Sequence, residues 1–256
     1  MKQFFQLAYF LLFWGITSIS SASENELTFL LLGQSNMAGQ GKVSELNGAM
    51  KRFPANVNFF LNGSKVTLST QQKFGPEVSF ARRVSQVFPS RKINLIKFAP
   101  GGSLMKDWLV GGYHYQTLAK QLDKIRKKHS LDVRGVLWMQ GERDTKSLLS
   151  GNHYKVSLEQ FILTLRRDLA KPRLPFIIAQ ISIPESYRPA VNLVKQAQQN
   201  TAKEMPAVSF FSTETLPRNA DKVHLSSEGQ LALGLRFAHY FAPRHAQNSS
   251  HTLVKK

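Results

Sequence analysis

One serine stands in a setting where its hydroxyl could act as a nucleophile. Ser35 lies in the segment GQSNMAG (33–39), directly after the apolar run 27–32, which has the pattern of a buried strand. In a tight turn that opens a helix, free backbone N–H groups can activate a hydroxyl or bind an anion. A Ser/Asn helix cap would explain the same residues. A nucleophilic role therefore requires a base elsewhere in the chain.

A base and an acid of suitable types stand close together near the end of the sequence. Asp221 precedes His224 by three positions, in an expected loop before the last helix. At this spacing the carboxylate can reach the imidazole Nδ1, where it fixes the tautomer and stabilises the imidazolium. Alone, an Asp-x-x-His pattern is weak evidence. No comparable acid and loop accompany the other histidines, which are His114, His129, His153, His239, His245 and His251.

Two further segments could donate hydrogen bonds to a developing oxyanion. Gly102 lies in KFAPGGS (97–103), where two glycines permit a close backbone approach, and Gln140 lies in LWMQGERD (137–144). Losing one such donor typically slows a reaction about 100- to 1000-fold. An ordinary turn and a polar loop are the alternatives. All four segments follow expected strands or precede the last helix, and ligands of parallel sheets gather at the carboxyl ends of the strands.

The elements that must position these segments alternate along the chain. This alternation of short apolar runs with longer amphipathic ones is typical of βαβ units, and it predicts one α/β domain with a mainly parallel sheet. We expect strands at 27–32, 57–61, 66–68, 93–99, 133–139, 176–183 and 208–211, and helices at 76–88, 115–129, 154–170, 189–204 and 226–241. Ser226, with Leu225 before it, is the expected N-cap of the last helix.

Five motifs together resemble a known family. They are GQSNMAG (33–39), FGPE (74–77), KFAPGGS (97–103), LWMQGERD (137–144) and DKVHLSSEGQLALG (221–234). On them the sequence resembles the SGNH (GDSL-like) hydrolases, within the carbohydrate-esterase branch of sialate O-acetylesterases and acetylxylan esterases of carbohydrate esterase family six. The resemblance covers about residues 27–242. It implies a three-layer α/β/α sandwich around a short, mainly parallel, flavodoxin-like sheet.

The resemblance also implies roles for single residues. Ser35 matches the nucleophile, His224 the base and Asp221 its orienting acid. Gly102 and Gln140 match the oxyanion-hole positions, together with the backbone N–H of Ser35. Glu142 matches the glutamate of the family's QGE motif and is a supporting or alternative acid. One departure concerns Arg143, which replaces the small residue usual at this place and puts the substrate shape at the rim in question.

The implied function is that of an exported serine esterase that removes O-acetyl groups from carbohydrates through an acetyl-serine intermediate, with no cofactor or metal. A lipase or thioesterase of the same fold, acting on other acyl esters, is one alternative. A basic, non-catalytic protein that binds glycans or nucleic acid is another. The sequence does not distinguish among acetylated glycans, and it leaves the oligomeric state open.

The composition of the chain excludes several classes of protein and of functional site. The chain lacks cysteine, which excludes disulfide scaffolds, thiolate metal sites and a cysteine nucleophile. Its 34 Lys and Arg against 16 Asp and Glu give a net charge of +18. These cations are scattered and lack the interleaved aromatics of a base-stacking surface, so we expect no nucleic-acid partner. An acetylated carbohydrate is the expected partner.

The first residues have the character of a secretory signal peptide. A basic start (Met1, Lys2) is followed by a mostly apolar run from Phe4 to Ile19 and by small residues up to Ser23. We therefore predict a cleaved leader at 1–23, an esterase domain at 24–243 and a polar, disordered tail at 244–256. The predicted location is periplasmic or extracellular, with no stable membrane insertion after cleavage. A retained membrane anchor is the alternative.

Overall fold

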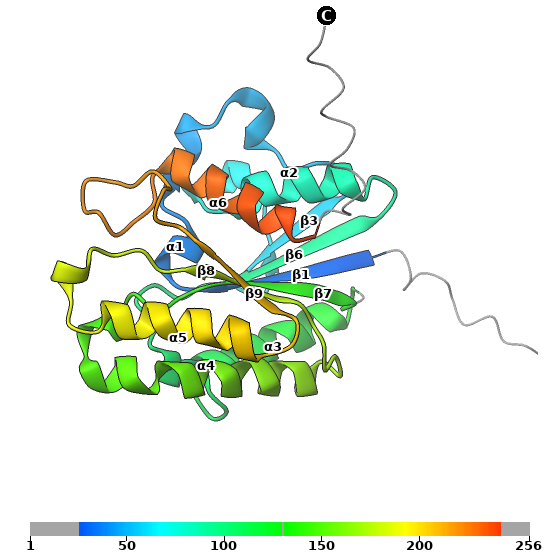
Figure 1. Cartoon of the computed structure of the whole chain (residues 1–256). Helices are drawn as coiled ribbons and strands as arrows, with labels where there is room; N and C mark the ends of the chain where they lie inside the picture. The colour runs from blue at the N-terminus through cyan, green and yellow to red at the C-terminus, as the bar shows by residue number, and fades with distance from the viewer. Residues whose placement is uncertain (1–25, 130, 242–256) are drawn as a thin grey trace, which may run out of the picture.

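A mostly parallel sheet forms the centre of a computed structural model that describes residues 26–129 and 131–241 (Figure 1). In the described residues the strand order is β4-β3-β6-β1-β7-β8-β9, and only β4 runs antiparallel to its neighbour. The strands are β1 (Glu26–Gly33), β3 (Val57–Leu61), β4 (Ser64–Lys65), β6 (Lys92–Phe98), β7 (Val133–Met139), β8 (Phe176–Gln180) and β9 (Val208–Ser212).

Helices cover both faces of this sheet, as Figure 1 shows. The helices α2 (Glu77–Val87) and α6 (Ser227–His239) lie on one face. The helices α3 (Tyr113–Arg126), α4 (Leu148–Asp168) and α5 (Val191–Glu204) lie on the other. The three-layer α/β architecture with a mainly parallel sheet that the sequence predicts is therefore confirmed.

The central strand β1 explains why the sheet forms where it does. Phe29 and Leu31 point into the core beneath α2 and α6, whereas Leu30 and Leu32 point into the core beneath α3, α4 and α5. All four side chains are at most 1% exposed. A strand buried on both faces needs apolar residues at every position, which gives the continuous apolar run seen in the sequence.

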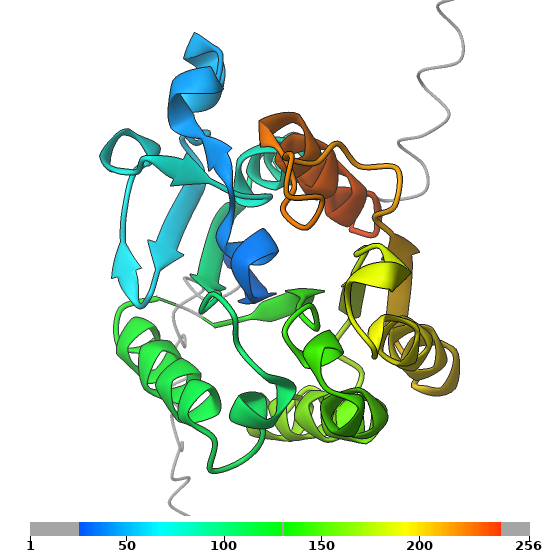
Figure 2. The ribbon, with the colours of Figure 1, turned by 90° about the vertical axis from the view of Figure 1, so that its left-hand side faces the viewer.

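The strand order places a topological switch point beside β1. When the β3–β4 hairpin at the edge is left aside, the remaining order β6-β1-β7-β8-β9 is that of flavodoxin-like folds, in which ligands bind where the connections diverge beside the first strand. Figure 2 looks onto the carboxyl ends of the strands. The short helix α1 (Ser35–Ala38), which follows β1, lies near the middle of this view.

Two expectations about the elements were wrong. The helix α4 begins at Leu148 rather than at residue 154, because Ser147 caps it by accepting a hydrogen bond from the N–H of Ser150 at 3.4 Å. No strand covers 66–68, where Leu68 instead begins a 3₁₀ helix. The predicted cap of α6 is confirmed, since Ser226 Oγ accepts from the N–H of Gly229 at 3.2 Å.

Several short elements escaped the sequence analysis. A two-stranded antiparallel sheet joins β2 (Gly41–Lys42) to β5 (Lys73–Phe74). The described residues also include 3₁₀ helices at Val43–Glu45, Gly48–Lys51, Leu68–Thr70, Met105–Trp108, Asp144–Lys146 and Glu185–Tyr187. Most of these elements belong to the connections that rise from the carboxyl edge of the sheet.

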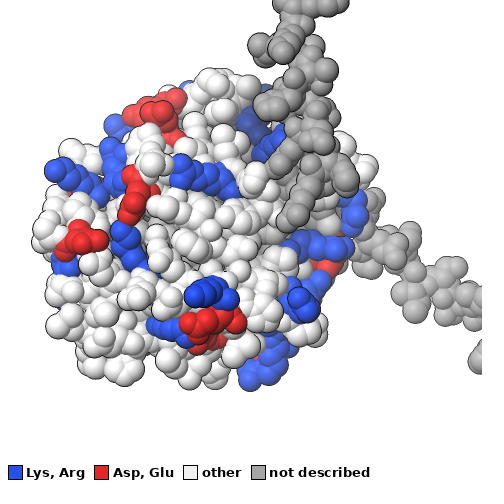
Figure 3. Space-filling model, viewed as in Figure 1, with Lys and Arg blue, Asp and Glu red and all other residues white. Residues whose placement is uncertain are grey.

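The predicted leader at 1–23 and the predicted tail at 244–256 lie outside the described residues. Within the described ranges, no helix combines the length and apolar character needed to cross a membrane. On the face drawn in Figure 3, basic side chains are interspersed with acidic and neutral ones. That face carries no continuous basic patch.

Candidate active site

The turn that carries Ser35 is built by the end of β1. Gly33 has a φ of +151°, and a Cβ at this position would lie 2.0 Å from the carbonyl oxygen of Met139 on β7. Only glycine fits so close to the neighbouring strand. The N–H of Gln34 then donates to the same Met139 oxygen at 2.9 Å. The chain thus leaves the sheet sharply, and half-buried Ser35 begins α1.

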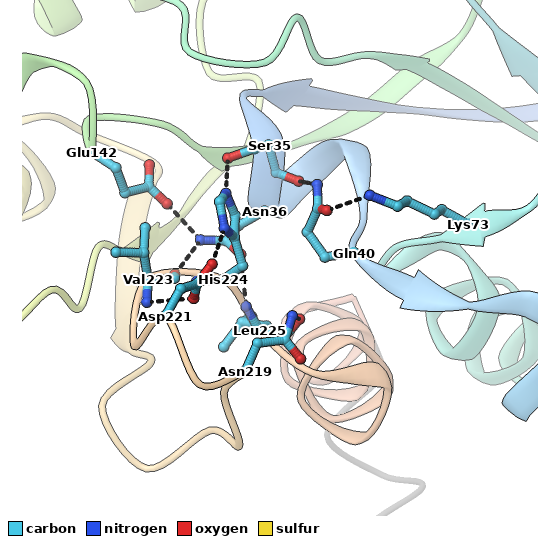
Figure 4. Close-up of polar contacts among 10 residues, drawn as sticks. All are labelled: Ser35, Asn36, Gln40, Lys73, Glu142, Asn219, Asp221, Val223, His224 and Leu225. Carbon is cyan, nitrogen blue, oxygen red and sulfur yellow. Dashed lines mark hydrogen bonds and ion pairs between the residues drawn. The ribbon is translucent and has the colours of Figure 1, made fainter.

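Ser35, His224 and Asp221 form a hydrogen-bonded row, as Figure 4 shows. His224 Nε2 lies 3.0 Å from Ser35 Oγ, and His224 Nδ1 lies 2.6 Å from Asp221 Oδ2. The histidine side chain remains 32% exposed, so a ligand can approach it. The structure therefore brings together the three residues that the sequence analysis proposed as nucleophile, base and orienting acid.

Asp221 also organises the loop in which it lies. Its Oδ1 accepts hydrogen bonds from the backbone N–H groups of Val223 and His224, both at 2.9 Å. Partial burial raises the pKa of Asp221, but these N–H groups and the imidazole outweigh it and hold the pKa below its ordinary value. The carboxylate is thus ionised and fixed toward His224.

Backbone and arginine hydrogen bonds join the two ends of the loop that carries Asp221 and His224. Arg218 donates to the carbonyl oxygens of Thr213 at 2.8 Å and Glu214 at 3.1 Å. Across the loop, the N–H of Asn219 donates to the carbonyl oxygen of His224 at 2.8 Å. The position of His224 is therefore set by the loop and not by the imidazole contacts alone.

Glu142 lies behind the row and does not join it. The side chain is 1% exposed, and its Oε1 accepts a hydrogen bond from Asn36 Nδ2 at 2.7 Å. Burial raises the pKa of Glu142 above its ordinary value, although the Asn36 bond acts in the opposite direction. Both ring nitrogens of His224 already have partners in Ser35 and Asp221.

Gln140, the predicted oxyanion donor, has its side-chain amide bonded within the protein. Its side chain is fully buried, and Nε2 donates to the carbonyl oxygen of Ser103 at 2.8 Å and to Asp144 Oδ2 at 2.6 Å. Its Oε1 accepts from the hydroxyl of Tyr154 at 2.9 Å. Both amide hydrogens are used inside the protein, so this conformation offers none to a substrate. Gln140 instead ties the loop after β7 to the loop after β6.

Asp144 makes a second connection between the same two loops, next to the turn that contains Gly102. Asp144 accepts from the N–H of Met105 at 3.1 Å as well as from Gln140, and burial raises the pKa of Asp144 to about 6. The adjoining turn contains Gly102, which is exposed and has a φ of +66°. Its N–H remains a candidate oxyanion donor, since β6 neighbours β1 in the sheet.

A buried ion pair contacts the end of α1, the helix that follows the nucleophile turn. Lys97 Nζ lies 2.7 Å from Glu77 Oε2, and the two side chains are 3% and 2% exposed. Lys97 also donates to the carbonyl oxygen of Ala38, the last residue of α1, at 2.7 Å. Glu77 Oε1 accepts the N–H of Gly75 at 2.9 Å. The pair thus joins α1 to β6 and to the start of α2.

Some contacts around the site were missed from the sequence. Asn36, Lys97 and Glu77 stand inside the motifs quoted above, but their types alone do not show what they contact. Arg188 had no signal in the sequence, yet it donates to the carbonyl oxygen of Glu142. Arg143, the departure from the family pattern, is exposed, and its N–H lies 3.4 Å from Gln34 Oε1, beside the nucleophile.

The described residues hold no group of three or more His, Asp or Glu side chains arranged to bind a metal ion. A serine hydroxyl beside an imidazole that is oriented by a carboxylate is suited to nucleophilic attack on an acyl group.

Comparisons with known proteins identify the family of this chain. A carbohydrate esterase family, described as sialic acid-specific acetylesterase, matches residues 25–243. A probable carbohydrate esterase from Arabidopsis thaliana is 29% identical over 234 residues, which cover 82% of this chain and 88% of that protein.

Solved structures show the same fold. The crystal structure of a protein from Arabidopsis thaliana has a TM-score of 0.74 at 26% identity, covering 85% of this chain and 97% of that one. The structure of NanS has a TM-score of 0.69 at 14% identity, covering 86% and 97% of the respective chains. A carbohydrate acetylesterase from Xanthomonas citri has a TM-score of 0.66 at 16% identity, covering 82% and 55%. Given the family match over residues 25–243, this chain belongs to the carbohydrate esterase family described as sialic acid-specific acetylesterase, and it is an enzyme that hydrolyses ester bonds.

Proposed function

We propose that this enzyme is an exported serine esterase that removes O-acetyl groups from carbohydrates through an acetyl-serine intermediate. The observation that carries the proposal is the row Ser35–His224–Asp221, with separations of 3.0 Å and 2.6 Å between the bonded atoms. An imidazole held by a carboxylate on one nitrogen and a hydroxyl on the other is placed to accept the hydroxyl proton.

The geometry accounts for both halves of the reaction. His224 Nε2 takes the proton of Ser35 Oγ as that oxygen attacks the acetyl carbonyl carbon. The imidazolium, stabilised by Asp221, then gives the proton to the sugar oxygen as the carbon–oxygen bond breaks. This leaves an acetyl group on Ser35 and a free sugar hydroxyl. In the second half, His224 takes a proton from the water that attacks the acetyl carbon. The imidazolium then returns this proton to Ser35 Oγ as the bond from Oγ to the acetyl carbon breaks and acetate leaves.

Oxyanion stabilisation is assigned here to backbone groups. The N–H of Ser35 lies at the start of α1, and the N–H of Gly102 lies in the exposed turn after the neighbouring strand β6. Both are proposed donors to the oxygen of the tetrahedral intermediate. Gln140 is left out of this role because its amide hydrogens are bound to Ser103 and Asp144.

Acetylated sialic acid is the first substrate to test. The family description supports it, and the backbone of exposed Arg143 lies next to Gln34, so a cationic residue that could favour the carboxylate of an acidic sugar adjoins the nucleophile turn. Acetylxylan is the neutral comparison. Acetate release is measured from acetylated sialic acid and from acetylxylan. Hydrolysis of an aryl acetate is compared with that of an aryl octanoate, which separates the proposed acetylesterase from a lipase or thioesterase.

The decisive variant is Ser35→Ala, with the exposed serine Ser64 on β4 changed to Ala as the matched control. Loss of a triad nucleophile typically lowers kcat by about 10⁴-fold or more. We expect this loss in Ser35→Ala with an unchanged thermal midpoint, and full activity in Ser64→Ala. A Ser35→Ala enzyme that still releases acetate would refute the mechanism.

Export and domain boundaries belong to the same proposal. Residues 1–23 are proposed as a cleaved leader, 24–243 as the esterase domain and 244–256 as a polar tail, with the mature enzyme periplasmic or extracellular. The pattern of a basic start, an apolar run and small residues supports this. N-terminal sequencing of the mature protein tests it, because a retained leader would favour a membrane anchor instead.

A further inference from the structure

Asn36, the residue after the proposed nucleophile, contacts the backbone of the two residues that flank the proposed base. Its side chain is 2% exposed and makes three hydrogen bonds (Figure 4). Its Oδ1 accepts the N–H of Leu225 at 2.9 Å, and its Nδ2 donates to the carbonyl oxygen of Val223 at 3.1 Å. The third bond runs from Nδ2 to Glu142 Oε1 at 2.7 Å. Val223 and Leu225 flank His224, so one amide holds the backbone on both sides of the base.

The Asn36 amide has only one orientation that satisfies these partners. The Glu142 carboxylate accepts hydrogen bonds but donates none when ionised, and the Val223 carbonyl also only accepts. The NH₂ group of Asn36 must therefore face both, which turns its oxygen toward the N–H of Leu225. Glu142 thus reinforces the amide orientation that clamps the His224 loop.

Glu142 itself has no direct route to the imidazole. Nδ1 of His224 is bonded to Asp221, and Nε2 is bonded to Ser35. The second carboxylate oxygen of Glu142, Oε2, is buried and has no hydrogen-bond partner among the described residues. Burying a carboxylate with so few bonds is unfavourable for stability. A contribution to the site, rather than to the fold, accounts better for its presence.

We propose that Asn36 is a positioning residue for His224, and that Glu142 acts by orienting the Asn36 amide instead of serving as an acid to the base. This inference rests on the proposed function, since it presupposes that His224 is the catalytic base. It also replaces the supporting or alternative acid role that the family resemblance implies for Glu142.

The first test exchanges the donor and the acceptor. In Asn36→Asp, the new carboxylate cannot donate to Val223 and faces Glu142. Interaction free energies between residues of one hydrogen-bond network reach about 3 kcal/mol, so we expect kcat to fall by up to about 150-fold. KM should change little, because Asn36 is buried. Adding Glu142→Gln supplies a donor to that carboxylate. The double variant should therefore have a kcat at least about tenfold higher than that of Asn36→Asp alone. Asn47→Asp is the matched control, because exposed Asn47 caps a 3₁₀ helix with an oxygen that Asp also has.

The second test does not depend on whether Asn36→Asp folds. Glu142→Gln keeps an oxygen that can accept from Asn36, whereas Glu142→Leu does not. Positioning predicts that Glu142→Gln retains most of kcat and that Glu142→Leu loses it at an unchanged KM. An acid role predicts that both lose kcat to a similar extent, and that outcome overturns the inference.

The outcomes also separate this inference from the proposed function. If Ser35→Ala remains active, the serine mechanism itself fails. If Ser35→Ala is inactive and Asn36→Asp retains the parental kcat, or if the double variant shows no recovery, only the positioning role fails. Thermal midpoints measured for every variant show whether a lost kcat reflects a lost fold.

Discussion

The buried pair Lys97–Glu77 allows a quantitative test of how the nucleophile turn is held. Both side chains are at most 3% exposed and their charged atoms lie 2.7 Å apart. Removing one partner of such a pair leaves an uncompensated buried charge and typically costs about 3–5 kcal/mol. We therefore expect Lys97→Met and Glu77→Gln each to lower the free energy of unfolding by about this amount.

The double variant should behave differently from the sum of the single ones. Replacing both members of a buried pair by uncharged residues of similar volume is often nearly neutral. Lys97→Met with Glu77→Gln should therefore recover most of the lost stability. The surface pair Arg126–Asp123, with side chains 55% and 69% exposed, is the matched control. Asp123→Asn should cost no more than about 1 kcal/mol.

The measurement is urea unfolding followed by circular dichroism, arranged as a double-mutant cycle, with kcat determined in parallel. Lys97 also donates to the carbonyl oxygen of Ala38 at the end of α1, and methionine cannot replace that bond. The double variant should thus regain stability while its kcat stays reduced. Additive losses, or single variants no worse than Asp123→Asn, would refute the argument that burial makes this pair important.

Two further predictions concern the loops beside the nucleophile. Burial raises the pKa of Asp144 from its ordinary 3.8 to about 6, so between these pH values the folded state binds more protons than the unfolded state. The protonated Asp144 therefore contributes to the free energy of unfolding. This contribution is fully present below about pH 4 and is lost as the pH rises through about 6. The loss amounts to about 3 kcal/mol, and Asp144→Asn should flatten it in urea midpoints measured from pH 4 to 7; an unchanged slope would contradict the assignment. Gly33→Ala should cost at least about 3 kcal/mol or prevent folding, because its Cβ would lie 2.0 Å from the Met139 oxygen, whereas Gly48→Ala, with nothing within 4 Å, should not.

The alternation of elements and the position of the site could be predicted from the sequence for a physical reason. A strand buried on both faces needs a continuous apolar run, and such runs mark Phe29–Leu32 in β1 and Val136–Met139 in β7. Polar segments that directly follow these runs must lie at one edge of a parallel sheet. Ser35 and Glu142 follow adjacent strands and therefore lie on the same edge as the loop that carries His224.

The start of α4 could not be predicted because its first turns lack the usual signals. Leu148 and Leu149 are 55% and 69% exposed, so apolar residues lie where a helix normally has polar ones. Gly151 lowers helix propensity, yet a Cβ there would lie 2.6 Å from the Cβ of Ala190 at the start of α5. The glycine serves close packing between two helices, which local periodicity does not report.

Competition between hydrogen-bond partners explains the rest of what the sequence left open. A motif places Gln140 beside the site, but the N–H groups of its amide are taken by Ser103 and Asp144, and only the folded chain shows this. The same counting applies to His224, which has two ring nitrogens and two partners, Ser35 and Asp221. In the proposed arrangement Glu142 acts through the Asn36 amide, which is the group it contacts. Roles in this site follow from which polar atoms remain free, which residue type and spacing do not determine.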